Sequence, residues 1–377
     1  GTAPREQGGR AKRGIALWQA LAVLVLAADL LIAGYGFNPA VDPAWLDFTP
    51  PSIEFLQARQ AEDPHFRVTS LSAPGVKTLN ANLPWLYDLQ DARGYGSIIT
   101  KQYVDYMSLI YDQYELLYNR IAPLSTEQMQ ALDSPLLDLL NVQYVVTEEE
   151  IESPKYALVY DGEVRVYENL GVMPRAFSLP ASSAVWISDL GNVLQTLDPR
   201  FYALLDGENG PAAGLPEADA QRGTPQPATI TVYSHNEVYV DANLAEPSWL
   251  ILADSYAPGW RAYQRPWGGS EGDEREVPIQ RHAGQFRAVY LEAGPHTVRF
   301  KYTPNSFKVG FFLTFLGGAT LALTLIVWLW RRYVGDNGAE RDAASGGAGD
   351  AQRVARNSVA PIVLQLFNKL VDMAFIM

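Results

Sequence analysis

The chain has 377 residues, enough for two or three domains, and carries 42 acidic against 29 basic residues, which gives a net charge of −13. This charge repels nucleic acid and leaves no basic stripe that could follow a phosphate backbone, so we exclude nucleic acid as a partner. The chain has no cysteine, which excludes disulfides, thiolate nucleophiles and cysteine metal sites.

Residues 15–37 form the first long apolar segment, interrupted only by Gln19 and Asp29, and they follow a basic end at residues 1–14. About 20 apolar residues suffice to cross a bilayer, so this segment is predicted to be a transmembrane helix. A cleaved signal peptide has the same charged start and apolar middle, and this alternative stays open. The long apolar stretch and the lack of a clear small-x-small cleavage site favour an uncleaved anchor.

Asp29 is the only ionisable residue inside this segment. A carboxylate at that depth costs about 2.5 to 3.5 kcal/mol on insertion scales, so it should face protein or water. We therefore predict that Asp29 contacts another membrane helix, with headgroup water at the outer interface as an equal alternative.

Residues 38–134 are predicted to form an extracytoplasmic helical region. Residues 50–60 indicate a helix with Ser52 as N-cap and Glu54 in its first turn. The Tyr and Leu spacing of residues 99–121 suits one face of a second helix.

Residues 135–207 change to a mixed α/β pattern. Residues 136–149 indicate a short helix that leads into a strand, and residues 155–170 indicate a hairpin with an Asp161-Gly162 turn. The Pro-, Gly- and Ala-rich residues 208–227 are predicted to be a linker.

Residues 228–304 contain seven short runs with period-two alternation and turn residues between them, the pattern of a β-sandwich. The inward faces of these runs are predicted to carry Val232, Val240, Leu250, Trp260, Val289 and Val298.

The aromatic turn at residues 256–267 poses a separate question, because aromatic rings at a turn can fill a core or bind a sugar. We place Trp260 between the sheets. Trp267 lies in a polar, glycine-rich segment and is the better candidate for an exposed ring. Trp267 and Tyr256 are the candidate contacts for a glycan or a protein partner.

Residues 309–330 form the second apolar segment, which ends in two arginines. Because basic ends stay in the cytoplasm, residues 38–307 are predicted to lie outside the cytoplasmic membrane of a bacterium. Gly310, Gly317 and Gly318 present a small-residue face that permits another helix to approach closely.

A Gly-, Ala- and Asp-rich stretch at residues 331–356 has the composition of a cytoplasmic linker, and residues 357–377 begin a third apolar helix. Since this helix stops at Met377 and the chain opens with Gly1, we expect a fragment or a processed product. The predicted fold class is α+β and membrane-anchored. It combines an extracytoplasmic mixed α/β region with a C-terminal seven-strand β-sandwich, flanked by transmembrane helices.

Signals for catalysis are weak throughout the sequence. The adjacent acids at residues 148–150 and 271–276 have the composition of glycoside-hydrolase carboxylates, but adjacent acids in turns are usually solvated. Residues 206–210 carry oxygen ligands without the spacing of a calcium loop. The four histidines lack metal-binding spacing, and no nucleophile elbow, Walker loop or Rossmann fingerprint occurs. We predict no catalytic residue, no metal and no cofactor.

Six segments, in this order along the chain, are typical of one protein family: HFRV at 65, DARGYGSIITKQYVDY at 91, LLNVQYVVT at 139, VRVYENLGVMPRAF at 164, ADSYAPGWRAY at 253 and LEAGPHTVRFKYTPNSFKVGFFLT at 291. Taken together, over roughly residues 15–332, they resemble the C-terminal region of bacterial YfhO-type membrane proteins. The resemblance implies a fold related to the GT-C glycosyltransferases that use lipid-linked sugars, acting in the decoration of envelope polymers.

The chain departs from such transferases in one respect that concerns the active site. In such transferases, the acidic residues that bind metal and act as general base are expected in a many-helix N-terminal half, which this sequence lacks. The resemblance therefore implies an architecture and no catalytic site. Residues 357–377 resemble the opening helix of MATE-like polysaccharide flippases, which implies a neighbouring envelope-sugar exporter.

Three functions remain open. The chain is the extracytoplasmic and anchoring part of a YfhO-like protein associated with cell-envelope glycan assembly, non-catalytic on its own; or an accessory subunit that packs against a large membrane complex; or an exported domain that binds or hydrolyses glycan. The first explains most of the residues. The expected partners are membrane lipid, other transmembrane helices or a larger membrane complex, and envelope glycan.

Overall fold

The computed structural model describes residues 17–35, 37, 42, 44, 48–96, 98–113, 120–207 and 221–331. Within them the chain forms a mixed α/β structure with three sheets and two long apolar helices. The mixed class and the two apolar helices predicted from the sequence are thereby confirmed. The predicted basic end and the third apolar helix lie outside the described residues, as do nearly all of the predicted cytoplasmic linker and most of the linker at 208–227.

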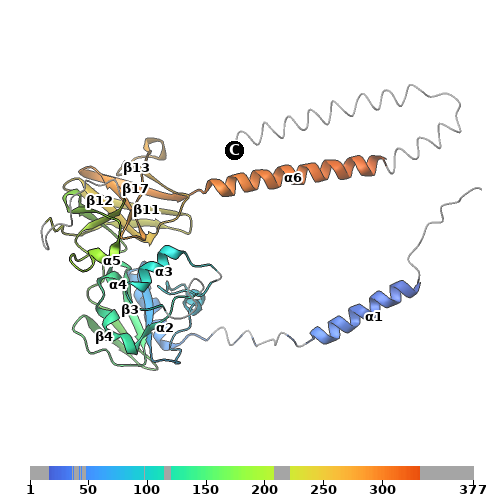
Figure 1. The fold of residues 1–377 in the computed structure, drawn as a ribbon, viewed down its shortest axis with the longest axis horizontal. Helices are drawn as coiled ribbons and strands as arrows, with labels where there is room; N and C mark the ends of the chain where they lie inside the picture. Colours follow the sequence, from blue (N-terminus) through green and yellow to red (C-terminus); the bar gives the residue numbers. More distant parts are fainter. Residues whose placement is uncertain are drawn as a thin grey trace, which may run out of the picture.

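The two long helices, α1 (Leu17–Gly34) and α6 (Asn305–Trp330), are long and apolar enough to cross a membrane. Neither helix is buried against the rest of the described chain. Figure 1 shows both standing apart from the globular part, and most of their large apolar side chains are exposed. This arrangement fits anchoring in a bilayer, although a signal sequence would have the same properties as α1.

Residues 48–173, the α/β unit, form the lower part of the globular body in Figure 1 and contain a five-stranded sheet of order β2-β1-β3-β5-β4. The β1–β3 and β1–β2 pairs are parallel, whereas β3–β5 and β5–β4 are antiparallel. The elements of the unit are α2 (Pro51–Glu62), β1 (Arg67–Ser72), η2 (Leu83–Tyr87), α3 (Lys101–Ser108), β2 (Leu124–Ser125), η3 (Thr126–Asp133), α4 (Pro135–Leu139), β3 (Val142–Thr147), β4 (Tyr156–Asp161) and β5 (Arg165–Asn169).

The inner strands β1 and β3 of the α/β unit are buried on both faces, whereas only Tyr156 of the edge strand β4 is buried. On β3, Tyr144 and Val146 pack with α2, whereas Val145 belongs to the cluster that contains α3 and α4. The predicted short helix leading into a strand is confirmed by α4 and β3, and the predicted hairpin by β4 and β5.

Two local predictions in this unit are wrong in detail. Ser52 is not the N-cap of α2, because Pro50 takes that position; the Ser52 amide instead donates to Glu163 Oε1 at 2.8 Å. Glu54 does lie in the first turn. The hairpin loop is longer than a two-residue turn, since Asp161 pairs with Arg165.

The helix predicted over residues 99–121 is shorter within the described residues. It is present as α3 and ends at Ser108, and the chain then turns away. Residues 114–119 lie outside the described part of the chain.

Residues 176–302, the two-sheet unit, form the upper part of the globular body. An inner sheet of order β7-β8-β15-β16-β12-β6-β9 consists of β6 (Ala176–Pro180), β7 (Ala184–Ile187), β8 (Ala203–Asp206), β9 (Gln226–Pro227), β12 (Ser248–Ser255), β15 (Gln280–His282) and β16 (Phe286–Leu291). An outer sheet of order β10-β11-β17-β13-β14 consists of β10 (Thr229–Tyr233), β11 (Glu237–Leu244), β13 (Trp260–Pro266), β14 (Arg275–Val277) and β17 (Gly294–Tyr302). Short helical turns lie between strands at η4 (Ala181–Ser183), α5 (Leu190–Val193) and η5 (Glu271–Asp273).

The inner sheet lies between two apolar layers. Leu250 and Leu252 of β12 join the cluster shared with the outer sheet, whereas Ile251 and Ala253 of the same strand join the cluster shared with α3 and α4. Successive side chains of a strand point to opposite faces, so one strand contributes to both layers. The α/β unit and the two-sheet unit therefore share a continuous core.

The seven-strand sandwich predicted for residues 228–304 differs from this arrangement. The inner sheet takes β6 to β9 from earlier in the chain, and β9 comes from the end of the predicted linker. Pro278 separates two short strands, β14 and β15, which belong to different sheets. Proline cannot donate a ladder hydrogen bond, so the strand breaks there and the chain crosses between the sheets.

Five of the six predicted inward residues do pack between the sheets: Val240, Leu250, Val289 and Val298 are fully buried and Trp260 is half-buried against the same cluster. Val232 was placed wrongly and is 47% exposed. It follows a register shift between Ile230 and Val232 on the edge strand β10, and a shift of one residue reverses the faces.

Candidate functional site

Four charged side chains from separate strand segments meet between the α/β unit and the two-sheet unit. Arg67 comes from β1, Arg175 from the residue before β6, Asp254 from β12 and Arg287 from β16. Each is a lone charge in an otherwise apolar stretch of sequence, and each side chain is at most 13% exposed. With Tyr233 they form the Asp254 cluster.

Asp254 holds the three arginines together. Its Oδ1 lies 2.7 Å from Arg175 Nη2 and 3.1 Å from Arg67 Nη2, and its Oδ2 lies 3.3 Å from Arg287 Nη2. The Tyr233 hydroxyl donates to Asp254 Oδ1 at 3.2 Å and accepts from Arg175 Nη2 at 2.7 Å. Both carboxylate oxygens are therefore engaged.

The electrostatics of the cluster follow from burial opposed by charge pairing. Burial alone would raise the pKa of Asp254, but attraction by Arg175, Arg287 and Arg67 outweighs it and lowers that pKa to about 2. Burial lowers the pKa of Arg67 and of Arg287 to about 10, against the attraction of Asp254. All four groups are charged at neutral pH, so the cluster carries three positive charges against one negative.

The ring of Trp260 stabilises one of these positive charges through a cation–π contact. The guanidinium carbon of Arg287 lies 3.7 Å from the centroid of the Trp260 ring, and Arg287 Nε and Nη1 have no hydrogen-bond partner among the described residues. An aromatic face attracts a cation most strongly where water is excluded. Trp260 therefore packs in the interior of the protein, so at residue 260 the aromatic turn has a packing role.

Arg67 fastens the α/β unit to the two-sheet unit. Besides Asp254 it donates through Nη1 to the carbonyl of Leu140 at 2.7 Å and to that of Ala253 at 2.8 Å. A rigid planar guanidinium suits such simultaneous contacts. One side chain thus bonds to backbone in both units.

A second buried ionic group joins the same two units. Asp138 of α4 is fully buried and pairs with Lys155 Nζ at 2.8 Å and with Arg200 Nη1, from the loop before β8, at 2.9 Å. Asn169 donates to Asp138 Oδ1 at 2.7 Å. Burial raises the pKa of Asp138, although hydrogen bonds from Lys155 and Asn169 oppose this.

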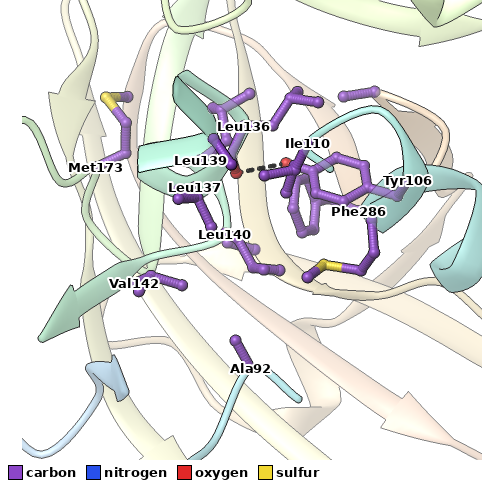
Figure 2. Packing of buried hydrophobic residues seen from close by; sticks show 14 of the residues in the cluster. Ala92, Tyr106, Ile110, Leu136, Leu137, Leu139, Leu140, Val142, Met173 and Phe286 are labelled. Carbon is purple, nitrogen blue, oxygen red and sulfur yellow. Dashed lines mark hydrogen bonds between the residues drawn. The ribbon is translucent and has the colours of Figure 1, made fainter. Parts of the chain in front are cut away.

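An apolar cluster with side chains from both units also lies at this junction. Figure 2 shows Tyr106 of α3 against Phe286 of β16, beside the leucines of α4. The two rings are 5.3 Å apart and edge to face, and the Tyr106 hydroxyl donates to the carbonyl of Leu136 at 2.8 Å. The junction therefore combines ion pairs with a packed core.

The charged groups of this junction hold the α/β unit and the two-sheet unit together. Asp254 and Asp138 are each paired with two or more cations, which leaves them poorly placed to accept a proton from a substrate. Within the described residues, no three His, Asp or Glu side chains lie together in a way that could hold a metal ion. The arrangement can fix two units relative to each other.

The predicted membrane contacts lie on the two long helices. Asp29 is exposed on α1 and makes no ion pair with another described residue. Gly310, Gly317 and Gly318 lie along α6, and a Cβ added to any of them would meet nothing within 4 Å. The structure brings none of these four residues to the junction, and their contact with other helices stays a prediction.

The two candidate glycan contacts are placed differently. Trp267 is 56% exposed, in the loop after β13. Tyr256 is half-buried, its amide donates to the carbonyl of Gln285 at 2.7 Å, and its carbonyl accepts from Gln102 Nε2 of α3. Tyr256 thus has a role in the junction, and of the two only Trp267 offers an open ring.

The acidic segment at 271–276 also differs from a pair of free carboxylates. Glu274 is held by Arg299 and by Arg265, the latter at 2.9 Å. Its side chain is 5% exposed. It therefore stabilises the outer sheet.

The sequence interpretation missed the Asp254 cluster, although a signal was present. Arg67, Arg175 and Asp254 lie inside HFRV, MPRAF and ADSY, three of the segments that carried the family resemblance. A lone charge in a buried strand requires a partner of opposite charge, so Arg67, Arg175 and Asp254 are each expected to pair with another buried charge. The sequence does not say which strands become neighbours.

Comparison with known proteins supports the same family. Residues 217–314 match the model of the family described as bacterial membrane protein YfhO. The match runs from β9 through β17 into α6, and it confirms the YfhO-type resemblance over this range. Together with the two apolar helices, this similarity fits a membrane-associated protein. No curated protein and no solved structure matches the chain.

Proposed function

We propose that this chain is the extracytoplasmic and anchoring part of a YfhO-like membrane protein associated with cell-envelope glycan assembly, and that it is not catalytic on its own. The observation that carries the proposal is the short passage from β17 to α6, in which only Thr303 and Pro304 separate the strand from the helix. A helix attached so closely to a strand restricts how the two-sheet unit can turn relative to a bilayer.

The aromatic turn packs against this short connection between β17 and α6. The Thr303 amide donates to the carbonyl of Gly259 at 2.8 Å, and a Cβ at Gly259 would lie 2.9 Å from Pro304 Cα. Trp260 packs on Tyr302 with 5.3 Å between ring centroids. The turn at 256–260 therefore packs against the base of α6, which supports a positioning role for this motif.

The Asp254 cluster and the ion pairs of Asp138 would hold the rest of the globular body in the same orientation. Because Arg67 and Asp138 tie the α/β unit to the two-sheet unit, both would be carried in one orientation by α6. Such a body suits binding and orientation of an envelope polymer or of other helices. Within it, Trp267 is the proposed glycan contact.

A second candidate function is an accessory subunit that packs against a larger membrane complex. Asp29 on α1 and the open glycine face of α6 support it, since both suit contact with further helices. Replacement of Asp29 by leucine should then release the partner during purification in mild detergent. Unchanged co-purification would contradict this role.

The topology can be tested cleanly because the chain has no cysteine. A single Trp267→Cys variant should react with a membrane-impermeant maleimide on intact cells, and a single Ser345→Cys variant should react only after permeabilisation. The reverse pattern would refute the extracytoplasmic placement.

The non-catalytic assignment is tested with the purified full chain. We expect no turnover with polyprenyl-phosphate sugars or envelope glycans, with or without divalent metal. Turnover that disappears on replacement of one carboxylate within residues 38–307 would place an active site in this chain.

A further inference from the structure

A cavity lies between the α/β unit and the two-sheet unit, beside the Asp254 cluster. Its lining includes His65 and Asn141 of the first unit, Ile230 of the second, and Arg175 where the two join. The volume is about 330 Å³. Small-molecule sites typically have about 300 to 1,000 Å³ and often lie between packed units. We call this space the His65 cavity.

Three side chains that line the His65 cavity each bury a polar atom without a hydrogen-bond partner among the described residues. These atoms are His65 Nδ1, Asn141 Oδ1 and Arg175 Nη1. Asn141 and Arg175 are only 4% and 5% exposed. A buried polar atom without a partner costs free energy, and folded proteins rarely keep one. Three of them at one cavity indicate that a partner binds there.

Neighbouring bonds show which of these atoms donate and which accept. Asn141 Nδ2 donates to the carbonyl of Met173 at 2.9 Å, which fixes the amide group and leaves Oδ1 as an acceptor. Arg175 uses Nε for Asp254 and Nη2 for the Tyr233 hydroxyl, so Nη1 remains as a donor. The cavity therefore offers a donor and an acceptor from two buried, firmly held side chains.

His65 is the adaptable member of the three. Burial and the charge of Arg175 lower the pKa of its ring, so the ring is neutral at pH 7 and Nδ1 donates or accepts according to the tautomer. The three unpartnered atoms are shielded from water, so a ligand reaches them only when a side chain moves. His65 is half-buried whereas Asn141 and Arg175 are buried, so its ring is the least enclosed.

The mixture of donor and acceptor favours a ligand with hydroxyl groups, since a hydroxyl both donates and accepts. A carboxylate only accepts, so it would leave Asn141 Oδ1 unpaired, and it would approach Asp63, which also lines the cavity. An ammonium group would approach Arg175 instead. Apolar side chains, among them Val172 and Ile230, line the cavity as well and suit C–H groups.

We infer that the His65 cavity binds one neutral sugar ring, whose adjacent hydroxyl groups pair with Arg175 Nη1, Asn141 Oδ1 and His65 Nδ1. A sugar ring carries hydroxyls around its edge and C–H groups on its faces, which matches a cavity with polar and apolar lining. The inference deepens the glycan part of the proposed function and rests on it. It adds a second contact to the one proposed for Trp267.

The first test is sugar binding by the purified full chain in a detergent that contains no sugar. Saturation-transfer NMR with glucose, galactose and N-acetylglucosamine should show transfer from the protein to at least one of them. The matching oligosaccharide should displace that sugar, and failure to do so would overturn the link to a glycan. Glucuronate binding in preference to all three neutral sugars would overturn the inference, because the excess positive charge of the Asp254 cluster would then decide the ligand.

Val172→Trp fills the cavity without changing the Asp254 cluster. Val172 is half-buried in the loop after β5, and Leu170 in the same loop is 63% exposed, so Leu170→Trp is the matched control. We expect Val172→Trp to abolish saturation transfer and Leu170→Trp to preserve it, with the melting temperature of each variant measured alongside. Transfer that persists in folded Val172→Trp protein would overturn the inference.

His65→Phe tests a single hydrogen bond and does not depend on the larger tryptophan being accommodated. The ring centroids of His65 and Tyr233 lie 5.1 Å apart, so phenylalanine keeps this contact and removes only the ring nitrogens. Loss of one neutral hydrogen bond should raise the dissociation constant about fivefold. His235→Phe, at an exposed histidine between β10 and β11, should leave the constant unchanged. Equal constants in both variants would contradict the contact with His65.

The failure of this inference is distinguishable from the failure of the proposed function. If envelope glycan binds the chain but no monosaccharide does, the cavity holds only water and the glycan part of the proposed function stands. Glycan binding that is lost in Trp267→Ala and survives in Val172→Trp leads to the same conclusion. If neither monosaccharide nor envelope glycan binds, the glycan part itself is contradicted.

Discussion

At the scale of single residues, the Asp254 cluster shows how one carboxylate can hold three buried cations. A buried charge is costly alone and acceptable when it is paired and hydrogen-bonded. Asp254 supplies the only carboxylate found in the cluster among the described residues, so its loss should affect the protein more than the loss of any one of the arginines.

Asp254→Asn should lower the free energy of unfolding by about 3 to 5 kcal/mol, because it leaves three arginines buried without a counter-charge. Since the folded pKa of about 2 lies below the ordinary value of 3.8, the stabilisation is present above about pH 4 and is lost as the pH falls toward 2. Urea unfolding of the detergent-solubilised chain at several pH values measures both effects. The variant should lack the acid-dependent component.

Glu276→Gln is the matched control for this prediction. Glu276 is 53% exposed and lies 3.6 Å from Arg261, a surface pair that contributes little to stability. A loss of stability similar to that of Asp254→Asn would contradict the importance given to the cluster.

At the scale of elements, the turn between β12 and β13 requires glycine for two separate reasons. Gly259 has φ +108°, and a Cβ there would meet Pro304 at 2.9 Å. Gly268, in the next turn, has φ +76° but open space around it. Gly268→Ala should cost about 1 to 2 kcal/mol through backbone strain alone.

Gly259→Ala should cost more than Gly268→Ala, since the strain is joined by a clash with the backbone that leads into α6. The melting temperatures of both variants, measured in one detergent, give the comparison. Equal shifts would mean that the turn is not packed on the base of α6.

At the scale of the whole molecule, the shared core predicts one cooperative unit. A fragment of residues 228–304 lacks β6, β7 and β8, which leaves β12 without its partner on one side and exposes the apolar face that meets α3 and α4. We expect this fragment to aggregate, whereas residues 48–304 should unfold in a single thermal transition. A folded, monomeric 228–304 fragment by circular dichroism would refute the shared core.

The sequence by itself determined the features that depend on local pattern. Apolar length predicted α1 and α6, period-two alternation predicted most strands after residue 228, and the glycine-rich surroundings of Trp267 predicted an exposed ring. Each of these depends on residues close in sequence, for which hydrophobic periodicity and turn chemistry are direct evidence.

Only the tertiary structure decided which distant segments meet. β6 to β9 complete the inner sheet, and Arg67 reaches Asp254 across 187 positions of sequence. Strand order and the pairing of buried charges arise from packing among remote segments, whereas a single strand specifies only its two faces. For the same reason the sequence could mark Arg67, Arg175 and Asp254 as charges in need of partners, and the fold alone made them partners of one another.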